Sequence, residues 1–249
     1  MYVSLIQRSL HWADPESNRK MMRNAIMFDY IPDVDLYVFP EMWTTGFVTD
    51  PQGIAESDGA SLRFMQQLAD ETDAAIAGSI AVEENGKYYN RFYFVKPHEA
   101  PEHYDKRHLF TYGGEHLHYT PGDRRVVVEW RGVRFLLQVC YDLRFPVFSR
   151  NHEDYDAIIY VASWPQSRRA AWDILLKARA IENQCYVLAV NRTGDDPKCE
   201  YLGGTIAIDP YGTTLVSSPD DASSRLTFPI NLDTLAAFRA KFPVLKDRD

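Results

Sequence analysis

Hydrophobic residues follow two patterns along the chain: short apolar runs, rich in β-branched and aromatic side chains, alternate with longer amphipathic stretches. The short runs are typical of strands, and the longer stretches are typical of helices with one buried side. The predicted strands cover residues 2–7, 34–39, 74–82, 88–96, 126–130, 133–139, 156–162, 186–190 and 204–208. The predicted helices cover residues 15–31, 61–71 and 167–184. Strands and helices that alternate in this way indicate an α/β fold.

Turn residues support several of these boundaries. The run at 84–87 (ENGK) lies between two predicted strands and indicates a hairpin, as does the pair at 131–132 (RG). Pro32 is expected to end the first helix, because proline cannot continue the hydrogen-bond ladder. The stretch 97–123 contains a cluster of histidines and no periodic pattern. It is therefore predicted to be a long loop with a functional role.

The helix predicted at 167–184 has the most regular pattern in the chain. Its apolar side chains fall on one side, which is expected to face the core: Ala171, Ile174, Leu175, Ala178 and Ile181. Its polar side chains lie off that side: Arg168, Asp173, Lys177 and Glu182. An amphipathic helix of this kind is expected to cover a sheet.

Composition narrows the class of protein. The 249 residues are 45% hydrophobic and 25% charged, and no repeat or linker divides them, so one domain over residues 1–249 is expected. The formal net charge of −8 argues against a nucleic-acid partner, which would need a dense cationic surface. No apolar run reaches the roughly 18 residues of a membrane span, and no signal peptide is recognisable. A cytoplasmic protein without a membrane partner is therefore predicted.

The odd number of cysteines, 3, fits a reducing compartment. Cys185 lies inside an apolar run and is expected in the core, whereas Cys199 lies in a polar loop and is expected at the surface. Cys140 ends a predicted strand, and Glu41 follows another one. Lys106 is the third reactive group. Each alone would be interpreted as packing or surface charge, but strand ends in α/β sheets gather active-site groups, so their combination matters.

Three sequence blocks resemble the signature blocks of the nitrilase superfamily of carbon–nitrogen hydrolases: FPEMWTTGF at 39–47, DKRHLF at 105–110 and CYDLRFP at 140–146. Their order and spacing match as well, and the similarity covers nearly the whole chain. The resemblance implies the four-layer αββα sandwich of that superfamily. It also implies a catalytic triad: Glu41, Lys106 and Cys140. Within the superfamily, the sequence looks most like the omega-amidase branch.

Each residue type in such a triad has a chemical role. A free thiol with a pKa of about 8.5 is mostly protonated at neutral pH, so Glu41 is expected to act as the base for Cys140. Lys106 is expected to stabilise the oxyanion, with the backbone N–H of Tyr141 as a second donor. Glu115, where the family often has a second glutamate, either holds Lys106, orients the substrate or is an ordinary loop carboxylate. Ammonia and a thioester form, and no cofactor or metal is expected.

Omega-amidases hydrolyse the terminal amide of 2-oxo-dicarboxylic acid monoamides such as 2-oxoglutaramate and 2-oxosuccinamate, and the resemblance implies such a substrate here. An anionic substrate on an acidic protein needs a local cation. Arg168 and Arg169 are the candidates, unless both are solvated charges in the first turn of a helix. Trp43, Tyr112 and Trp164 are candidates for the walls of the pocket.

Several alternatives stay open at this point. The substrate could instead be an N-carbamyl amino acid or an aliphatic nitrile or amide. A papain-like Cys–His site is less economical, but the histidines in 97–123 keep it open. The same histidines lack the paired spacing of a zinc site. A non-catalytic binding domain with Cys140 as a redox-sensitive thiol is the alternative outside enzymes.

Two expectations concern partners. The substrate is expected to be a small-molecule amide. Members of the superfamily commonly pair through helices beside the active site, and the helix at 167–184 resembles that element, so a homodimer is expected. The carboxy-terminal run at 230–249 is expected to reach a neighbouring subunit.

Overall fold

Two six-stranded sheets form the centre of the computed structural model, which describes residues 1–28, 31 and 33–248. The first sheet has the order β14-β1-β2-β3-β4-β5, with β1 (Tyr2–Gln7), β2 (Leu36–Val38), β3 (Ala75–Glu84), β4 (Lys87–Val95), β5 (Glu102–Asp105) and β14 (Ser224–Pro229). The second has the order β13-β12-β9-β8-β7-β6, with β6 (Val127–Trp130), β7 (Val133–Val139), β8 (Ala157–Ala162), β9 (Tyr186–Asn191), β12 (Ile206–Ile208) and β13 (Thr214–Ser217). A separate hairpin consists of β10 (Thr193–Asp195) and β11 (Glu200–Leu202).

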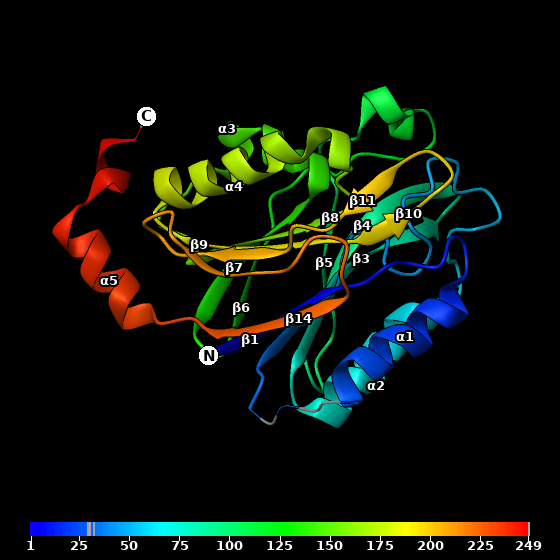
Figure 1. Cartoon of the computed structure of the whole chain (residues 1–249), viewed down its shortest axis with the longest axis horizontal. Coiled ribbons are helices and arrows are strands. Elements are labelled where there is room, and N and C mark those ends of the chain that lie inside the picture. The colour runs from blue at the N-terminus through cyan, green and yellow to red at the C-terminus, as the bar shows by residue number, and fades with distance from the viewer. Residues whose placement is uncertain (29–30, 32, 249) are drawn as a thin grey trace.

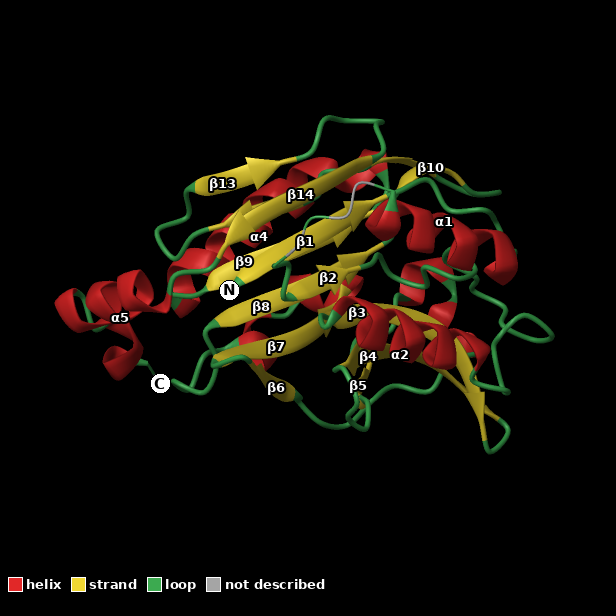
Figure 2. Ribbon diagram, turned by 90° about the horizontal axis from the view of Figure 1, so that it is seen from below, coloured by secondary structure: helices red, strands yellow, loops and turns green. Residues whose placement is uncertain are grey.

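Helices cover the outer faces of both sheets (Figures 1 and 2). The first sheet is covered by α1 (Pro15–Met27) and α2 (Ala60–Thr72), and the second by α3 (Pro146–Ser149) and α4 (Arg169–Asn183). One hydrophobic cluster fills the space between the sheets and extends beneath α4, and another lies between the first sheet and its helices. The layers are therefore helix, sheet, sheet and helix. The predicted α/β class and four-layer αββα sandwich are confirmed.

The central strands are buried on both faces, which explains their sequence. In and just after β2, Leu36 and Val38 belong to the cluster between the sheets, whereas Tyr37 and Phe39 pack towards α1 and α2. Successive side chains of a strand point to opposite faces, and here both faces are covered by other layers. Such strands are continuous apolar runs in the sequence, so their positions are predictable.

Most predicted elements are confirmed to within a few residues. The predicted strands at 2–7 and 133–139 coincide with β1 and β7. The first helix, predicted to reach residue 31, ends at Met27, and residue 32, where the proline stop was expected, lies outside the described residues. The prediction of a loop throughout 97–123 is wrong, because β5 lies within it. This four-residue edge strand pairs only with β4 and buries a single residue, Tyr104, so it has no apolar pattern.

The buried side of α4 differs from the predicted one. Ile174 is 68% exposed and Ile181 is 54% exposed, so the prediction is wrong for these two residues, whereas Ala171 and Leu175 do pack against the core. The buried side chains of the helix are Trp172, Leu176, Arg179, Ala180 and Asn183. The Trp172 indole N–H donates to a backbone carbonyl at 2.8 Å, and the Arg179 guanidinium donates to Leu143 O at 2.6 Å. These hydrogen bonds compensate for the burial of two polar groups, and a hydrophobicity pattern does not contain them.

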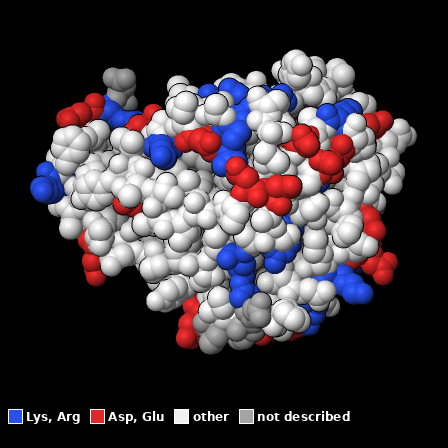
Figure 3. Space-filling view, in the orientation of Figure 1, with Lys and Arg blue, Asp and Glu red and all other residues white. Residues whose placement is uncertain are grey.

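The helix α5 (Leu232–Lys241) projects beyond one end of the sheets (Figure 1). Arg239 anchors it to its own chain by donating to the carbonyl oxygens of Gln184 and Tyr155, both at 2.9 Å. A contact of this segment with a neighbouring subunit stays a prediction. On the side of the molecule seen in Figure 3, acidic and basic side chains are interspersed. None of the described helices is long and apolar enough to cross a bilayer.

Candidate active site

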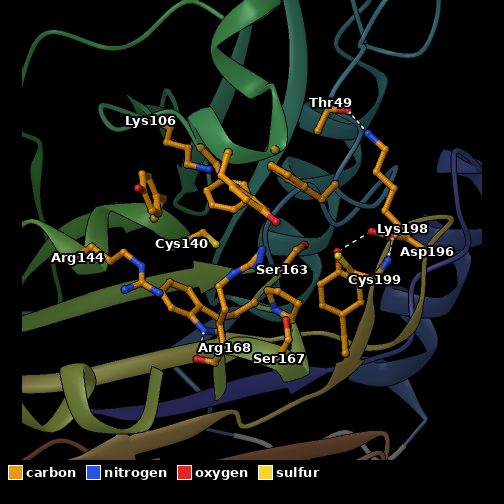
Figure 4. Close-up of a pocket in the computed structure, with 18 residues that line it drawn as sticks. Thr49, Lys106, Cys140, Arg144, Ser163, Ser167, Arg168, Asp196, Lys198 and Cys199 are labelled. Carbon is orange, nitrogen blue, oxygen red and sulfur yellow. Dashed lines mark hydrogen bonds between the residues drawn. The ribbon is translucent and has the colours of Figure 1, made fainter. Parts of the chain in front are cut away.

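Polar and reactive side chains lie where strands of both sheets end. Glu41 lies beyond β2, Cys140 directly follows β7, and Ser163 directly follows β8. Because β2 runs parallel to β1 and β3, and β7 runs parallel to β8, these chain ends meet at one edge of the sandwich. Lys106 follows β5 at the same place. A cavity of about 420 Å³ opens over Lys106, Cys140 and Ser163 (Figure 4).

Two carboxylates and one ammonium group form a fully buried cluster at the base of the cavity. Lys106 Nζ lies 2.9 Å from Glu41 Oε1 and 2.9 Å from Glu115 Oε2. Asn90 Nδ2 donates to Glu41 Oε1 at 2.8 Å and to Glu115 Oε1 at 3.1 Å. The backbone N–H of Ser163 donates to Glu41 Oε2 at 2.8 Å. Glu115 is therefore bound to Lys106, and the interpretation as an ordinary loop carboxylate is wrong.

Neighbouring charges fix the protonation of this cluster. Burial by itself lowers the pKa of Lys106, but the charges of Glu115 and Glu41 outweigh it and hold that pKa above its ordinary value. The ammonium group is therefore charged at neutral pH. Burial raises the pKa of the Glu115 carboxyl group, the charge of Glu41 adds to this, and Lys106 opposes it. Two carboxyl groups therefore share one ammonium group.

Cys140 occupies a sharp turn between β7 and a short helix. Its φ of +46° lies in the left-handed region that residues other than glycine rarely adopt. This backbone conformation costs about 1–3 kcal/mol, which contacts with the surrounding residues must offset. The turn directs the thiol into the cavity (Figure 4). Burial raises the pKa of the Cys140 thiol well above its ordinary value, and the charge of Glu41 raises it further, while Lys106 opposes both. The resting thiol is therefore protonated at neutral pH.

Asp142, which sequence reasoning missed, holds this turn in place. Its Oδ2 accepts hydrogen bonds from the backbone N–H of Val139 at 2.9 Å and from the Tyr104 hydroxyl at 2.8 Å. Its Oδ1 accepts from the backbone N–H of His108 at 3.0 Å, and the His108 ring Nδ1 lies 2.7 Å away. The buried carboxylate thus joins the Cys140 turn to the segment after Lys106. An acidic residue between apolar neighbours at a strand end is the signal that could have found it.

Three predicted substrate-binding residues line the cavity: Tyr112, Trp164 and Arg168. Trp164 is buried in the wall, whereas Tyr112 is 86% exposed. The Arg168 guanidinium lies 5.0 Å from the centre of the Phe110 ring and 5.5 Å from that of Tyr112. Tyr141, predicted to contribute its backbone N–H, lines the cavity as well.

The other two predicted substrate-binding residues lie elsewhere. Trp43 is fully buried on the helix side of the first sheet, where its ring packs 5.7 Å from that of Phe64. It is a core residue, so the prediction that it forms a pocket wall is wrong. Arg169 pairs with Asp173 at 2.7 Å and with Asp220 at 2.8 Å, outside the cavity. Its charge is already compensated, and the prediction that it binds substrate is wrong.

Sequence reasoning did not identify several further side chains in the cavity wall: Phe47, Phe110, Arg144, Ser163 and Lys198. It also placed Cys199 at the surface, but this residue is half-buried and lines the cavity. Its local sequence could not predict this position, because the loop between β10 and β11 folds over the site. Cys185 is fully buried in the core, as predicted.

The described histidines do not take part in the site. None of them lines the cavity, and His108 contacts Asp142 instead. The alternative of a papain-like Cys–His site is therefore wrong. Within residues 1–28, 31 and 33–248, no group of three or more His, Cys, Asp or Glu side chains is arranged to hold a metal ion.

One protein family and several known proteins are similar to this chain. The family model for carbon–nitrogen hydrolases matches residues 2–240. The chain is 42% identical to the omega-amidase YafV of Yersinia enterocolitica, covering 99% of this chain and 96% of that protein. It is 34% identical to the 2-oxoglutaramate amidase of Bacillus subtilis, covering 98% and 96%. XC1258 from Xanthomonas campestris, a CN-hydrolase superfamily protein solved with an arsenic adduct in its active site, matches with a TM-score of 0.96 and 40% identity, covering 97% of that chain and 100% of this one.

The chain belongs to the carbon–nitrogen hydrolase family. It is a hydrolase that acts on carbon–nitrogen bonds of linear amides, and omega-amidases are among its relatives. Both statements confirm what the sequence blocks implied. The alternative of a non-catalytic binding domain is not supported.

Proposed function

We propose that the chain is a cysteine-dependent amidohydrolase that cleaves the terminal amide of a 2-oxo-dicarboxylic acid monoamide, such as 2-oxoglutaramate or 2-oxosuccinamate, and releases ammonia. The observation that carries the proposal is the convergence of Glu41, Lys106 and Cys140 at the base of one cavity. The relatives described as an omega-amidase and a 2-oxoglutaramate amidase support the substrate class.

The first step joins Cys140 Sγ to the amide carbon. Because the thiol is protonated at rest, Glu41 takes its proton as the S–C bond forms. The electrons of the C=O double bond move to oxygen, and the oxyanion is stabilised by the Lys106 ammonium group and the backbone N–H of Tyr141. Tyr141 is the second residue of a short helix, where N–H groups lack intrahelical partners. Glu115 keeps Lys106 in position.

Breakdown of this intermediate releases ammonia. Glu41 returns its proton to the amide nitrogen as the C–N bond breaks, which leaves a thioester on Cys140. A water molecule then attacks the thioester carbon while Glu41 takes its proton. The S–C bond breaks, the sulfur regains a proton, and the carboxylate product leaves. The balance is one amide and one water consumed for one carboxylate and one ammonium ion, so no cofactor is needed.

Replacing the nucleophile tests this mechanism. Cys140→Ala is expected to abolish ammonia release from 2-oxoglutaramate while the far-ultraviolet circular dichroism stays unchanged. In the wild-type enzyme quenched during turnover, peptide mass mapping is expected to find the acyl group on Cys140 and on neither Cys185 nor Cys199. Turnover by the alanine variant within tenfold of wild type would refute the mechanism.

A substrate panel tests the specificity. Ammonia release is measured from 2-oxoglutaramate, glutamine, asparagine, N-carbamyl-β-alanine and a simple aliphatic nitrile, with the 2-oxo amide expected to have the highest kcat/KM. Carbon dioxide appearing with ammonia would identify the N-carbamyl compound as substrate. The highest kcat/KM with the nitrile would likewise contradict the proposal.

A homodimer that pairs through α4 is also part of the proposal. Ile174 and Ile181 are seven residues apart, so they lie on one side of the helix, and both leave apolar surface in water on the outer layer of the sandwich. Sedimentation equilibrium is expected to give the mass of a dimer for the wild type and of a monomer for Ile174→Glu. A monomeric wild type would contradict the pairing. A single domain over 1–249 and a cytoplasmic location stay predictions.

A further inference from the structure

The cavity wall is cationic although the chain has a formal net charge of −8. Besides Lys106, three cationic side chains line it: Arg144, Arg168 and Lys198. Asp196 is the acidic side chain among the described lining residues. Its carboxylate is already bound within its own loop, since it accepts the Tyr201 hydroxyl at 2.5 Å and the backbone N–H of Lys198 at 2.7 Å. Positive charge is therefore available to an anionic ligand.

Arg168 differs from its neighbour Arg169 in what compensates its charge. Arg169 pairs with two aspartates, whereas Arg168 forms no ion pair with any of the described residues. Its guanidinium is held by the rings of Phe110 and Tyr112, at 5.0 and 5.5 Å. Contacts with ring faces position a guanidinium without using its N–H donors. The N–H donors of the planar Arg168 guanidinium are thus left to bind a ligand.

The other two cations lie at the sides of the cavity. Arg144 stacks on the Trp164 ring at 5.0 Å, and Lys198 Nζ donates to the Thr49 hydroxyl at 3.0 Å. Figure 4 shows them at opposite sides of the view, while the side chain of Arg168 points into the middle, between Cys140 and Ser163. Arg168 is therefore the cation that faces a ligand whose reacting carbon lies at the thiol.

We propose that Arg168 determines specificity by binding the carboxylate of the amide substrate, at the end opposite to the amide. The inference rests on the proposed function, which places the amide carbon at Cys140. A guanidinium binds a carboxylate through two parallel N–H···O bonds, which fixes direction as well as position. The substrate class is therefore a short linear amide with an anionic group at its far end.

The buried cluster enforces the direction of binding. In the cluster of Glu41, Glu115 and Lys106, the single ammonium group is already paired with two carboxyl groups, so the amide position offers no unpaired cation to a carboxylate. A monoamide therefore enters with its neutral end at Cys140 and its charged end at Arg168. Hydrolysis creates a second carboxylate beside that cluster. Because no unpaired cation binds this new carboxylate there, release of the dicarboxylate product is favoured.

The first experiment compares two substrates of the same shape. One is 2-oxoglutaramate, and the other is 4-oxopentanamide, in which a methyl group replaces the carboxylate. Arg168→Gln is expected to lower kcat/KM for 2-oxoglutaramate by about 10- to 100-fold, mainly through KM, because one charged hydrogen-bond partner is lost. Its kcat/KM for 4-oxopentanamide is expected to change less than twofold. Arg168→Lys, which keeps the charge but not the fork, is expected to fall between the two.

Arg169→Gln is the matched control, because it removes the same charge one residue away and outside the cavity. It is expected to leave the ratio of the two kcat/KM values unchanged. An unchanged ratio in Arg168→Gln would overturn the inference. So would a selective loss that occurs in Arg144→Gln and is absent from Arg168→Gln.

A binding measurement tests the inference independently of turnover. The probe is 2-oxopentanoate, which has the carboxylate but no amide, and the readout is protection of Cys140 from iodoacetamide. Arg168→Gln is expected to raise the half-protecting concentration by about 10- to 100-fold, and Arg169→Gln is expected to leave it unchanged. Equal protection of wild type and Arg168→Gln, or none in either, would overturn the inference. Absence of ammonia release by the wild type would refute the proposed function alone, because protection that depends on Arg168 would still establish the carboxylate site.

Discussion

Replacing Asp142 by asparagine tests how the turn that carries Cys140, the proposed nucleophile, is held in position, without changing the thiol itself. The Asp142 carboxyl group accepts three hydrogen bonds, its Oδ1 also lies 2.7 Å from the His108 ring Nδ1, and it touches neither the cavity nor the thiol. Asparagine has nearly the same shape, but one of its two terminal groups is a donor. Whichever way the amide is turned, the backbone N–H of Val139 or that of His108 faces an NH₂ group. The Tyr104 hydroxyl can instead reverse its role and accept, and the His108 ring Nδ1 can donate or accept according to its tautomer.

The size of the effect follows from this count. One buried backbone N–H without an acceptor costs about 1–3 kcal/mol, and for a chain of this length each kcal/mol lowers Tm by about 2–4 °C. The unpaired group lies next to the strained Cys140 turn, which also presents the Tyr141 N–H. A displacement of about 1 Å in a reacting group lowers rates on the order of 10²-fold. We therefore expect kcat to fall by about 10²-fold with little change in KM.

Urea unfolding and steady-state ammonia release are the assays, with Asp173→Asn as the matched control. Asp173 forms an exposed ion pair with Arg169, and such pairs contribute about 0–1 kcal/mol. The control is therefore expected to keep wild-type activity and nearly wild-type stability. If Asp142→Asn retained kcat within twofold of wild type, or lost no more stability than the control, the assignment of Asp142 as a positioning residue would be refuted.

Three further predictions concern the charged groups around the thiol. Glu41→Gln is expected to abolish turnover but to speed alkylation of Cys140 by iodoacetamide at pH 7, because the charge of Glu41 raises the pKa of that thiol; slower alkylation would contradict this. In the wild type the raised pKa keeps the thiol protonated to higher pH than a free cysteine, so the alkylation rate is expected to keep rising above about pH 9, and a plateau at neutral pH would count against it. Lys106→Met is expected to lower kcat by about 10²- to 10³-fold, and a loss below tenfold would show that the ammonium group does not stabilise the oxyanion.

Burial on both faces is what made the central strands predictable. A strand such as β8, Ala157–Ala162, is apolar throughout because another layer covers each face, so the sequence alone identifies it. The pattern fails where polar groups are buried or where a strand lies at a sheet edge. On the buried side of α4, Trp172 and Arg179 donate to backbone carbonyl oxygens, and β5 is held by strand pairing with a single buried side chain.

The site residues also differ in whether a local sequence pattern could identify them. Glu41, Lys106 and Cys140 were identifiable because short motifs surround each of them, and the structure brings them together. Trp43 belongs to such a motif but packs in the core. The motif does not indicate which layer of the sandwich a side chain faces. The wall residue Cys199 comes from a loop without any motif. Its place in the cavity depends on how the β10–β11 hairpin folds over the sheets, which no local pattern contains.

The distribution of charge along the cavity links catalysis to specificity. The proposed base Glu41 lies in a buried site beside Lys106, which is also paired with Glu115. The ammonium group of Lys106 is thus already paired with two carboxyl groups and is not available to the charged end of an anionic substrate. An uncompensated cation farther along the cavity is then a requirement of the chemistry, and Arg168 meets it. The need for a local cation thus follows from the pairing of Lys106 within the buried cluster and does not depend on the net charge of the protein.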